Sequence, residues 1–319
     1  MRAVRCCEGR VEVVDVPAPS GDGVRVRVRS SGICGSDLHL ITSTEFPVHA
    51  TLGHEFAGVT DDGTPVAIEP LLPCGECGFC VSGDYQRCVI GPTMILGTAL
   101  DGGMADEVIV PERCLVPLPG GLRVEDACLV EPTAVAVHGF VQIDLKGDQR
   151  VAIVGGGSIG LAAVAVARAS GARVDLVARH AAQLEAGERL GARPIGEGDA
   201  ADAGDYDVVV DAAGTKSALE RCVELARPGG TLLLLASYWE GMELPGFALC
   251  MKEVRVVPSA MYGRRSVGRD VDIAASVLAN RPEIARTMIT HRFPLDAAPD
   301  AFATAADRGS GAIKVVLEP

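Results

Sequence analysis

The stretch Val151 to Gly160 reads V-A-I-V-G-G-G-S-I-G and decides the fold. Its four leading apolar residues predict a buried strand, and the alanine-rich run that continues to about Ser170 predicts a helix. Gly155, Gly157 and Gly160 lie between them as G-x-G-x-x-G. In such a loop the first glycine permits a tight turn, the second lets backbone approach a pyrophosphate, and the third lets helix pack on strand. The order of strand, glycines and helix favours a dinucleotide site over an ordinary turn in another doubly wound domain.

The phosphates of that nucleotide are expected at the N-terminus of the helix, where unpaired N–H groups and the helix dipole favour anions. The expected contacts in the loop are Gly155, Gly157, Ser158, Ile159 and Gly160. Strands then alternate with helices along the chain, with strands expected at 173–177, 206–210, 231–236 and 254–259 and helices at 181–190 and 217–226. This alternation predicts a parallel sheet.

Composition bounds the class of protein. The chain has 319 residues, enough for about two domains, and 48% of them are hydrophobic. A net charge of −13 disfavours nucleic acid or an anionic membrane surface as the main partner. The N-terminus lacks the apolar core of a signal peptide, and the apolar runs fall short of a membrane span. We therefore expect a cytoplasmic protein.

Four of the eleven cysteines form the run C-x2-C-x2-C-x7-C. They are Cys74, Cys77, Cys80 and Cys88. Four thiolates on a short excursion suit a closed, tetrahedral structural zinc. The spacing resembles one cysteine run of iron–sulfur proteins, but the fourth interval differs and the C-P ending is absent. The acidic composition disfavours a nucleic-acid zinc ribbon. We predict a zinc that holds a loop in shape, in a lobe at about 72–90.

A second set of metal donors is spread over two glycine-flanked segments, G-I-C-G-S-D-L-H at 32–39 and G-H-E-F-A-G at 53–58. Thiolate, imidazole and carboxylate are the usual zinc ligands. Singly, each of these residues has an ordinary structural reading; together they indicate a metal site in loops. A catalytic zinc keeps three protein ligands and one open position, so we expect a further ligand from elsewhere in the chain.

These features resemble the zinc-containing medium-chain dehydrogenases, the group of alcohol, sorbitol and threonine dehydrogenases. The resemblance spans nearly the whole chain and rests on C-G-S-D-L-H at 34–39, G-H-E-F-A-G at 53–58, the four-cysteine run, D-G-G-M-A-D at 101–106, E-P-T-A-V-A-V-H at 131–138, the glycine loop and G-A-I-K-V-V at 311–316. It implies an α/β protein with a mostly-β, GroES-like catalytic domain at 1–130 and 264–319. A Rossmann domain with a doubly wound parallel sheet is implied at 131–263.

The resemblance also implies roles for individual residues. Cys34, His54 and Glu131 would bind the catalytic zinc, Glu131 directly or through water, and Glu55 would enter or leave the metal shell. Asp37 would orient His54. Zinc would lower the pKa of a bound alcohol, Ser36 would take its proton, and His39 would receive that proton by way of the cofactor ribose. Two zinc ions per chain follow, one catalytic and one structural.

The cofactor prediction depends on the end of the second strand of the nucleotide domain. An enzyme that uses NAD needs an acidic residue there for the ribose 2′-hydroxyl. Asp175 comes three residues too early, and the expected position holds Ala178, followed by Arg179. Without a repelling carboxylate, a guanidinium can bind a 2′-phosphate, so we predict NADP(H). The alternative is that Arg179 stacks on adenine and either nucleotide binds.

The sequence thus predicts an NADP(H)-dependent zinc oxidoreductase that interconverts a secondary or polyol-type alcohol and its ketone or aldehyde. One alternative is an NAD-dependent polyol dehydrogenase. Another is a nucleotide-binding protein that has lost turnover, which the complete set of expected active-site residues disfavours. We expect a small-molecule partner and a homodimer or homotetramer.

Overall fold

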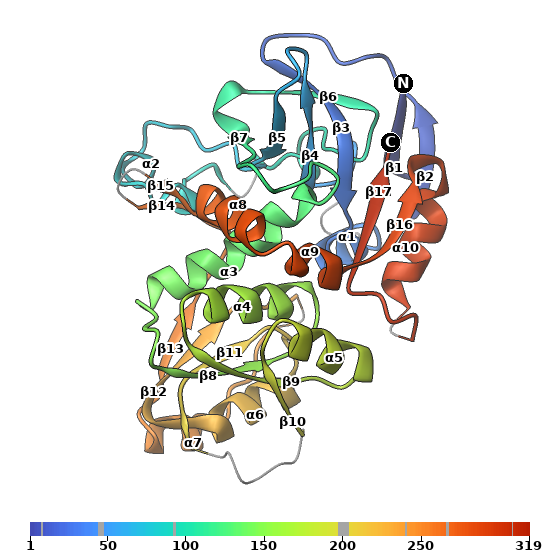
Figure 1. Ribbon diagram of the computed structural model, residues 1–319. Coiled ribbons are helices and arrows are strands. Elements are labelled where there is room, and N and C mark those ends of the chain that lie inside the picture. Colours follow the sequence, from blue (N-terminus) through green and yellow to red (C-terminus); the bar gives the residue numbers. More distant parts are fainter. Residues whose placement is uncertain are drawn as a thin grey trace. The chain divides into compact units, whose positions relative to one another are not determined.

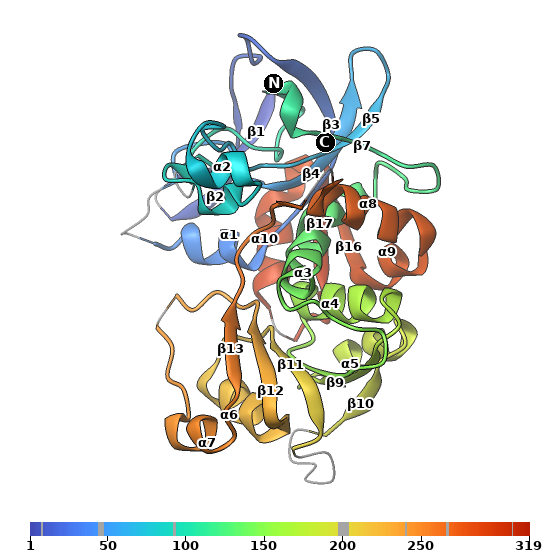
Figure 2. The same ribbon diagram turned by 90° about the vertical axis from the view of Figure 1, so that its left-hand side faces the viewer.

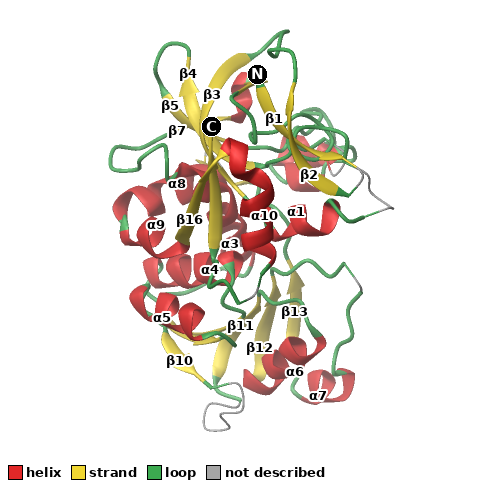
Figure 3. Cartoon of the chain, turned by 90° about the vertical axis from the view of Figure 1, so that its right-hand side faces the viewer, coloured by secondary structure: helices red, strands yellow, loops and turns green. Residues whose placement is uncertain are grey.

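The computed structural model describes residues 1–7, 9–43, 48–91, 94–196, 204–239, 241–265, 268–307 and 309–319. The chain divides into two compact units. One consists of Met1–Glu131 together with Gly263–Pro319, and the other of Pro132–Tyr262. Coloured by secondary structure, the first unit is rich in strands and the second combines a sheet with helices (Figure 3). None of the described helices is both long and apolar enough to cross a membrane.

The second unit is built on a six-stranded parallel sheet with the order β10-β9-β8-β11-β12-β13 (Figure 1). The strands are β8 (Arg150–Val154), β9 (Arg173–Val177), β10 (Arg193–Ile195), β11 (Tyr206–Asp211), β12 (Ala226–Leu234) and β13 (Arg255–Pro258). Strand β8 lies between β9 and β11. From β8 the chain first adds β9 and β10 on one side and then crosses to add β11, β12 and β13 on the other, as in doubly wound dinucleotide-binding sheets. Strands β12 and β13 lie side by side at one end of the sheet (Figure 2).

Helices cover both faces of this sheet. They are α4 (Ser158–Ala169), α5 (Ala181–Arg189), α6 (Lys216–Leu225) and α7 (Gly246–Met251), with α3 (Val130–Gln142) leading into the unit. Helices α4 and α5 lie on one face, and α6 and α7 on the other (Figure 1). The strands read as near-continuous apolar runs because both faces are buried. Ala152, Val209 and Leu232, for example, are each fully buried in the core.

The first unit contains a seven-stranded sheet with the order β16-β17-β3-β4-β5-β7, to which β6 adds by pairing with β3. The strands are β3 (Val24–Gly32), β4 (Glu55–Thr60), β5 (Pro65–Ile68), β6 (Glu107–Val110), β7 (Leu115–Pro117), β16 (Ile289–Pro294) and β17 (Lys314–Glu318). Two hairpin-like pairs accompany it, β1 (Arg2–Cys7) with β2 (Arg10–Asp15) and β14 (Arg264–Arg265) with β15 (Gly268–Arg269). The alternating V-R-V-R-V-R of β3 buries valines and exposes arginines, as the pleat requires.

Short helices decorate this unit. They are α1 (Gly35–Leu40), α2 (Gly78–Ser82), α8 (Asp270–Asn280), α9 (Glu283–Met288) and α10 (Ala298–Ala306), with 3-10 turns at η1 (Tyr85–Arg87), η3 (Glu112–Cys114), η4 (Ala127–Leu129) and η6 (Leu295–Ala297). Helix α10 lies against β16 and β17 (Figure 3), and one apolar core forms there. A second core forms around Phe56, between strands β3 to β6.

Two local expectations were wrong. The acidic residues of V-E-D at 124–126 predict the start of a helix of roughly 20 residues, but α3 begins only at Val130, after a 3-10 turn. Pro132 explains this, because proline is tolerated in the first turn of a helix but its ring clashes with the carbonyl four residues earlier when the helix extends further back. The segments 34–39 and 53–58 are not both loops, since Cys34 caps helix α1 and Glu55 opens strand β4.

Candidate metal centres and nucleotide-binding loop

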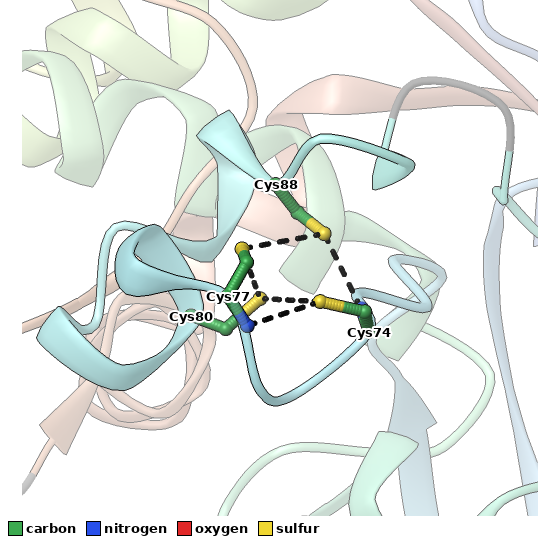
Figure 4. A group of neighbouring side chains, drawn as sticks. All are labelled: Cys74, Cys77, Cys80 and Cys88. Carbon is green, nitrogen blue, oxygen red and sulfur yellow. Dashed lines mark hydrogen bonds between the residues drawn. The ribbon is translucent and has the colours of Figure 1, made fainter.

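The four clustered cysteines converge in the structure. Their sulfur atoms lie within 4.8 Å of one another, with separations of 3.8 Å for Cys74 and Cys80, 3.5 Å for Cys77 and Cys80, and 4.0 Å for Cys77 and Cys88 (Figure 4). Four sulfurs at about 2.3 Å from a tetrahedral zinc would be about 3.8 Å apart. A hydrogen bond from the backbone of Cys80 lowers the pKa of Cys77 to about 6, which favours the thiolate that binds metal. The donor set fits a closed zinc site.

A buried polar network fastens this cysteine loop to the rest of its unit. Tyr85, within the loop, donates its hydroxyl proton to the carboxylate of Glu69, and the same hydroxyl lies 3.2 Å from the carbonyl oxygen of Gly263. Arg269 Nη1 lies 3.0 Å from the other oxygen of Glu69. Because Glu69 follows β5 and Arg269 precedes α8, the network joins three separate stretches of chain at one point. This arrangement suits a role in holding the loop in shape.

A second convergence brings together Cys34, His54 and Glu55, whose ligand atoms also lie within 4.8 Å of one another. Strand pairing produces it. Glu55 at the start of β4 lies opposite Gly32 at the end of β3, and Cys34 follows Gly32 by two residues. His54 and Glu55 are buried and Cys34 is half-buried. Thiolate, imidazole and carboxylate at this spacing fit a zinc site.

The imidazole of His54 is held between two neighbours. Its Nδ1 lies 3.4 Å from Oδ1 of the fully buried Asp37, and its Nε2 lies 3.4 Å from Ser36 Oγ. Asp37 also accepts a 2.9 Å hydrogen bond from the backbone N–H of Cys34. Burial disfavours the charged imidazole, but the negative charges of Asp37 and Cys34 outweigh it, so the pKa of His54 is raised well above its usual value. The negative groups around this histidine therefore favour a positive charge at this position.

Glu55 has one neighbour that the motif search did not single out, Lys314. The two side chains form a buried ion pair, each 1% exposed, in which Lys314 Nζ lies 2.5 Å from Glu55 Oε2. Lys314 also donates a 3.0 Å hydrogen bond to the carbonyl of Ile33. The other carboxylate oxygen, Glu55 Oε1, is buried without a hydrogen-bond partner among the described residues. A buried carboxylate oxygen with no donor, beside a thiol and an imidazole, fits a site for a cation.

Close backbone contacts fix the position of the segment that carries His54. A Cβ on Gly102 would lie 2.2 Å from the carbonyl oxygen of Gly53, and one on Gly97 would lie 2.7 Å from the backbone nitrogen of His54. A Cβ on Gly103 would lie 2.1 Å from the ring of Phe56. Only glycine permits these approaches. The motif D-G-G-M-A-D therefore acts here as a packing surface for G-H-E-F-A-G.

The remaining expected zinc-site residues are placed as follows. Ser36 is half-buried in α1, and His39 is exposed on the last turn of the same helix. Glu131 lies in the first turn of α3 and is half-buried. Among the described residues, the converging donor group holds Glu55 and does not include Glu131. The role of Glu131 as a zinc ligand stays a prediction.

The glycine loop follows β8 directly. Gly155 has a φ of +113°, a conformation that side chains rarely adopt, and Gly157 is the N-cap residue of α4. A Cβ on Gly160 would lie only 1.8 Å from the carbonyl oxygen of Gly155, so helix and turn are in direct contact. Ser158 and Ile159 form the first turn of α4, and both are half-buried. The backbone N–H groups of such a turn can bind a pyrophosphate, so the geometry fits the expected loop contacts, which stay a prediction.

The end of β9 offers a cation and no free carboxylate. Asp175 lies within the strand, and its side chain accepts hydrogen bonds from Arg193, at 2.8 and 3.0 Å, and from the hydroxyl of Tyr206, at 2.6 Å. Ala178 and Arg179 follow the strand, and Arg179 is exposed. The acidic residue nearest in sequence is therefore engaged in its own ion pair.

Comparisons with known proteins agree with this geometry. Residues 20–120 match the alcohol dehydrogenase GroES-like domain, and residues 158–276 match the zinc-binding dehydrogenase family. The chain is 30% identical over 316 residues to galactitol 1-phosphate 5-dehydrogenase of Escherichia coli, covering 89% of this chain and 90% of that protein. It is 30% identical over 333 residues to D-xylulose reductase A of Aspergillus oryzae, covering 92% and 90%. A crystal structure of a zinc-binding dehydrogenase from Sinorhizobium meliloti bound to NADP superposes with a TM-score of 0.87 at 32% identity, covering 100% and 99% of the two chains.

Proposed function

This chain belongs to the zinc-containing medium-chain dehydrogenases and reductases, and on that premise we propose that it interconverts a secondary or polyol-type alcohol and its carbonyl compound with NADP(H). Its membership makes it a zinc-type alcohol oxidoreductase. The observation that carries the proposal is the convergence of Cys34, His54 and Glu55 within 4.8 Å in a buried setting. Two relatives are named galactitol 1-phosphate 5-dehydrogenase and D-xylulose reductase A, and these names support a polyol or sugar alcohol as substrate.

The residues of the site divide the chemistry between them. When bound, zinc lowers the pKa of an alcohol oxygen, and the nicotinamide accepts or returns the hydride. Cys34 and His54 would hold the metal, with Glu55 Oε1 or Glu131 as the further oxygen donor. Ser36, 3.4 Å from the imidazole, is positioned to take the hydroxyl proton of the substrate.

Two further residues act on that proton and on the histidine. Asp37 faces His54 Nδ1 at 3.4 Å and fixes the ring and its tautomer. His39, exposed on the last turn of α1, would receive the proton and release it to solvent. The four-cysteine cluster would hold a second zinc with no chemical role.

The proposed preference for NADP(H) rests on the end of β9. Ala178 stands where a carboxylate would repel a 2′-phosphate, and Arg179 supplies a guanidinium. The NADP bound to the Sinorhizobium relative supports this proposal. Fluorescence titrations of the purified protein with NADPH and NADH in one buffer test it without any substrate. In Ala178→Asp, NADPH affinity should fall more than about tenfold, because the new carboxylate repels the 2′-phosphate. In Arg179→Asp the fall should be at least as large, since a hydrogen bond to a charged group, which contributes about 1.5–3 kcal/mol, is also lost. Unchanged NADPH affinity in both variants would refute the assignment.

A turnover assay tests the reaction itself. The zinc-loaded protein is offered a panel of polyols, sugar alcohols and secondary alcohols with NADP⁺ and with NAD⁺, while reduced nicotinamide is measured. Cys34→Ser should abolish turnover and reduce the zinc content by one ion per chain, whereas the exposed Cys250→Ser should change neither. Retained turnover in Cys34→Ser would contradict the zinc mechanism. Turnover with NAD⁺ alone would favour an NAD-dependent polyol dehydrogenase, which the names of the relatives also suit.

We also propose that the protein forms a homodimer or homotetramer, which sedimentation of the purified protein tests.

A further inference from the structure

The carboxyl ends of three neighbouring strands meet around the glycine loop. A Cβ on Gly156 would lie 2.8 Å from Ala178 Cβ, at the end of β9, and one on Gly155 would lie 2.9 Å from the backbone of Ala212, just after β11. The glycine loop after β8 therefore touches the chain on both sides. Doubly wound sheets bind their nucleotide in the crevice at this reversal of strand order.

One hydrogen bond spans this meeting point. Arg179, which follows β9, donates from Nη2 to the hydroxyl oxygen of Ser217 at 3.0 Å. Ser217 is the second residue of α6, the helix that follows β11. Strands β9 and β11 are not neighbours, because β8 lies between them. The side chains thus join the two flanks of the crevice above the glycine loop.

The segment that carries Ser217 is held in place independently of Arg179. Asp211, fully buried at the end of β11, accepts hydrogen bonds from the backbone N–H groups of Ala213 at 2.9 Å and Gly214 at 3.1 Å. Thr215 caps α6 by accepting a 3.2 Å hydrogen bond from the N–H of Ala218. Ser217 is therefore presented from a fixed helix start.

We infer that Ser217 is a second determinant of specificity for the 2′-phosphate of NADP(H), acting together with Arg179; this inference rests on the proposed function. The residue that ends β9 faces the ribose 2′ position, so a phosphate there lies beside the guanidinium. Ser217 Oγ accepts from Arg179 and also lies 3.3 Å from Thr215 Oγ1. Thr215 Oγ1 accepts from the N–H of Ala218, so its own proton can go to Ser217 Oγ, and the Ser217 proton is then left for a phosphate oxygen. Two donors, one of them oriented by the other, then contact the phosphate, whereas a 2′-hydroxyl lacks the charge that rewards them.

The test compares the ratio of Kd for NADH to Kd for NADPH in the wild type, Ser217→Ala and Ser217→Thr. In Ser217→Ala the ratio should fall about tenfold, with Kd for NADH unchanged, because one of the two donors to the charged phosphate is lost. Ser217→Thr keeps the hydroxyl and should keep the ratio. Ser276→Ala is the matched control, because Ser276 is an exposed helical serine whose hydroxyl donates to the carbonyl of Asp272 in its own helix, at 2.9 Å.

The outcomes separate the two proposals. A wild type that does not prefer NADPH refutes the proposed cofactor and this inference with it. A wild type that prefers NADPH, and loses the preference in Arg179→Ala but keeps it in Ser217→Ala, leaves the proposed function standing and overturns the role of Ser217. Equal weakening of both nucleotides in Ser217→Ala would show a merely structural role and would also overturn it.

Discussion

Replacing Lys314 with methionine should destabilise the protein far more than the same replacement of a surface lysine. Lys314 and Glu55 are each 1% exposed, and their charged atoms lie 2.5 Å apart. At an effective dielectric constant of about 20, two unit charges at this distance attract by about 7 kcal/mol. Methionine retains most of the apolar volume but leaves the carboxylate buried without its partner. Breaking a buried pair in this way costs about 3–5 kcal/mol.

The assay is urea unfolding of the zinc-saturated protein, followed by circular dichroism. With a slope of about 3 kcal/mol per molar urea, the expected loss lowers the unfolding midpoint by about 1–1.7 M. Lys146→Met is the matched control, because Lys146 pairs with Asp144 at the surface and is 58% exposed. Its removal should cost less than about 1 kcal/mol.

A second variant separates the orphaned charge from lost packing. In Lys314→Met combined with Glu55→Gln the buried carboxylate is neutral, so at least half of the lost stability should return. A loss below about 1 kcal/mol in the single variant would refute the reasoning, since such pairs normally cost several times more to break. So would a double variant no more stable than the single one.

Three further predictions follow from the same contacts. Cys77→Ser should reduce the zinc content measured by mass spectrometry from two ions per chain to one, and two ions retained would contradict a four-thiolate site. Gly102→Ala places a Cβ 2.2 Å from a backbone oxygen, so it should lower the free energy of unfolding by about 1–3 kcal/mol and weaken zinc binding beside His54. Gly120→Ala is the control, because a Cβ there meets nothing within 4 Å and stability should change little. Equal losses of stability in the two variants would refute the crowding argument. Burial opposes ionisation of Asp175, but its hydrogen bonds from Arg193 and Tyr206 outweigh burial and lower its pKa, so its contribution is present above the ordinary pKa of about 4. That contribution to stability is lost as the pH falls through the lowered pKa. In urea unfolding, Asp175→Asn should therefore lower the free energy of unfolding by about 1 kcal/mol at neutral pH and leave it unchanged in strong acid. A loss that is the same at both pH values would contradict this.

Local patterns made the nucleotide unit and the cysteine cluster predictable. Strand 173–177, R-V-D-L-V, was predicted with the bounds that the structure shows, because its valines and leucine form a short β-type stretch between turns. The four cysteines converge because their spacing lies within 15 consecutive residues. In both cases the deciding interactions are close in sequence.

The ion pair of Lys314 and Glu55 could not be predicted in this way, because 259 residues separate its members. Helix α1 was missed for a different reason: with six residues it is too short to show helical periodicity. It is recognisable only through Asp37, whose carboxylate accepts from the backbone of the preceding Cys34. An aspartate three residues after a candidate ligand is a usable signal for such a cap.

The position of Asp175 bears directly on the cofactor. From the sequence alone, an aspartate three residues before the expected position can be taken for a shifted ribose ligand. The structure gives this carboxylate other partners, because Arg193 on the adjacent strand and the hydroxyl of Tyr206 both donate to it. Turning it toward a ribose would break two hydrogen bonds from Arg193 and one from the hydroxyl of the fully buried Tyr206, and a single ribose hydrogen bond would replace only one of these three. Asp175 is therefore a structural residue of the sheet, which supports the proposal that a 2′-substituent at the end of β9 meets the positive charge of Arg179.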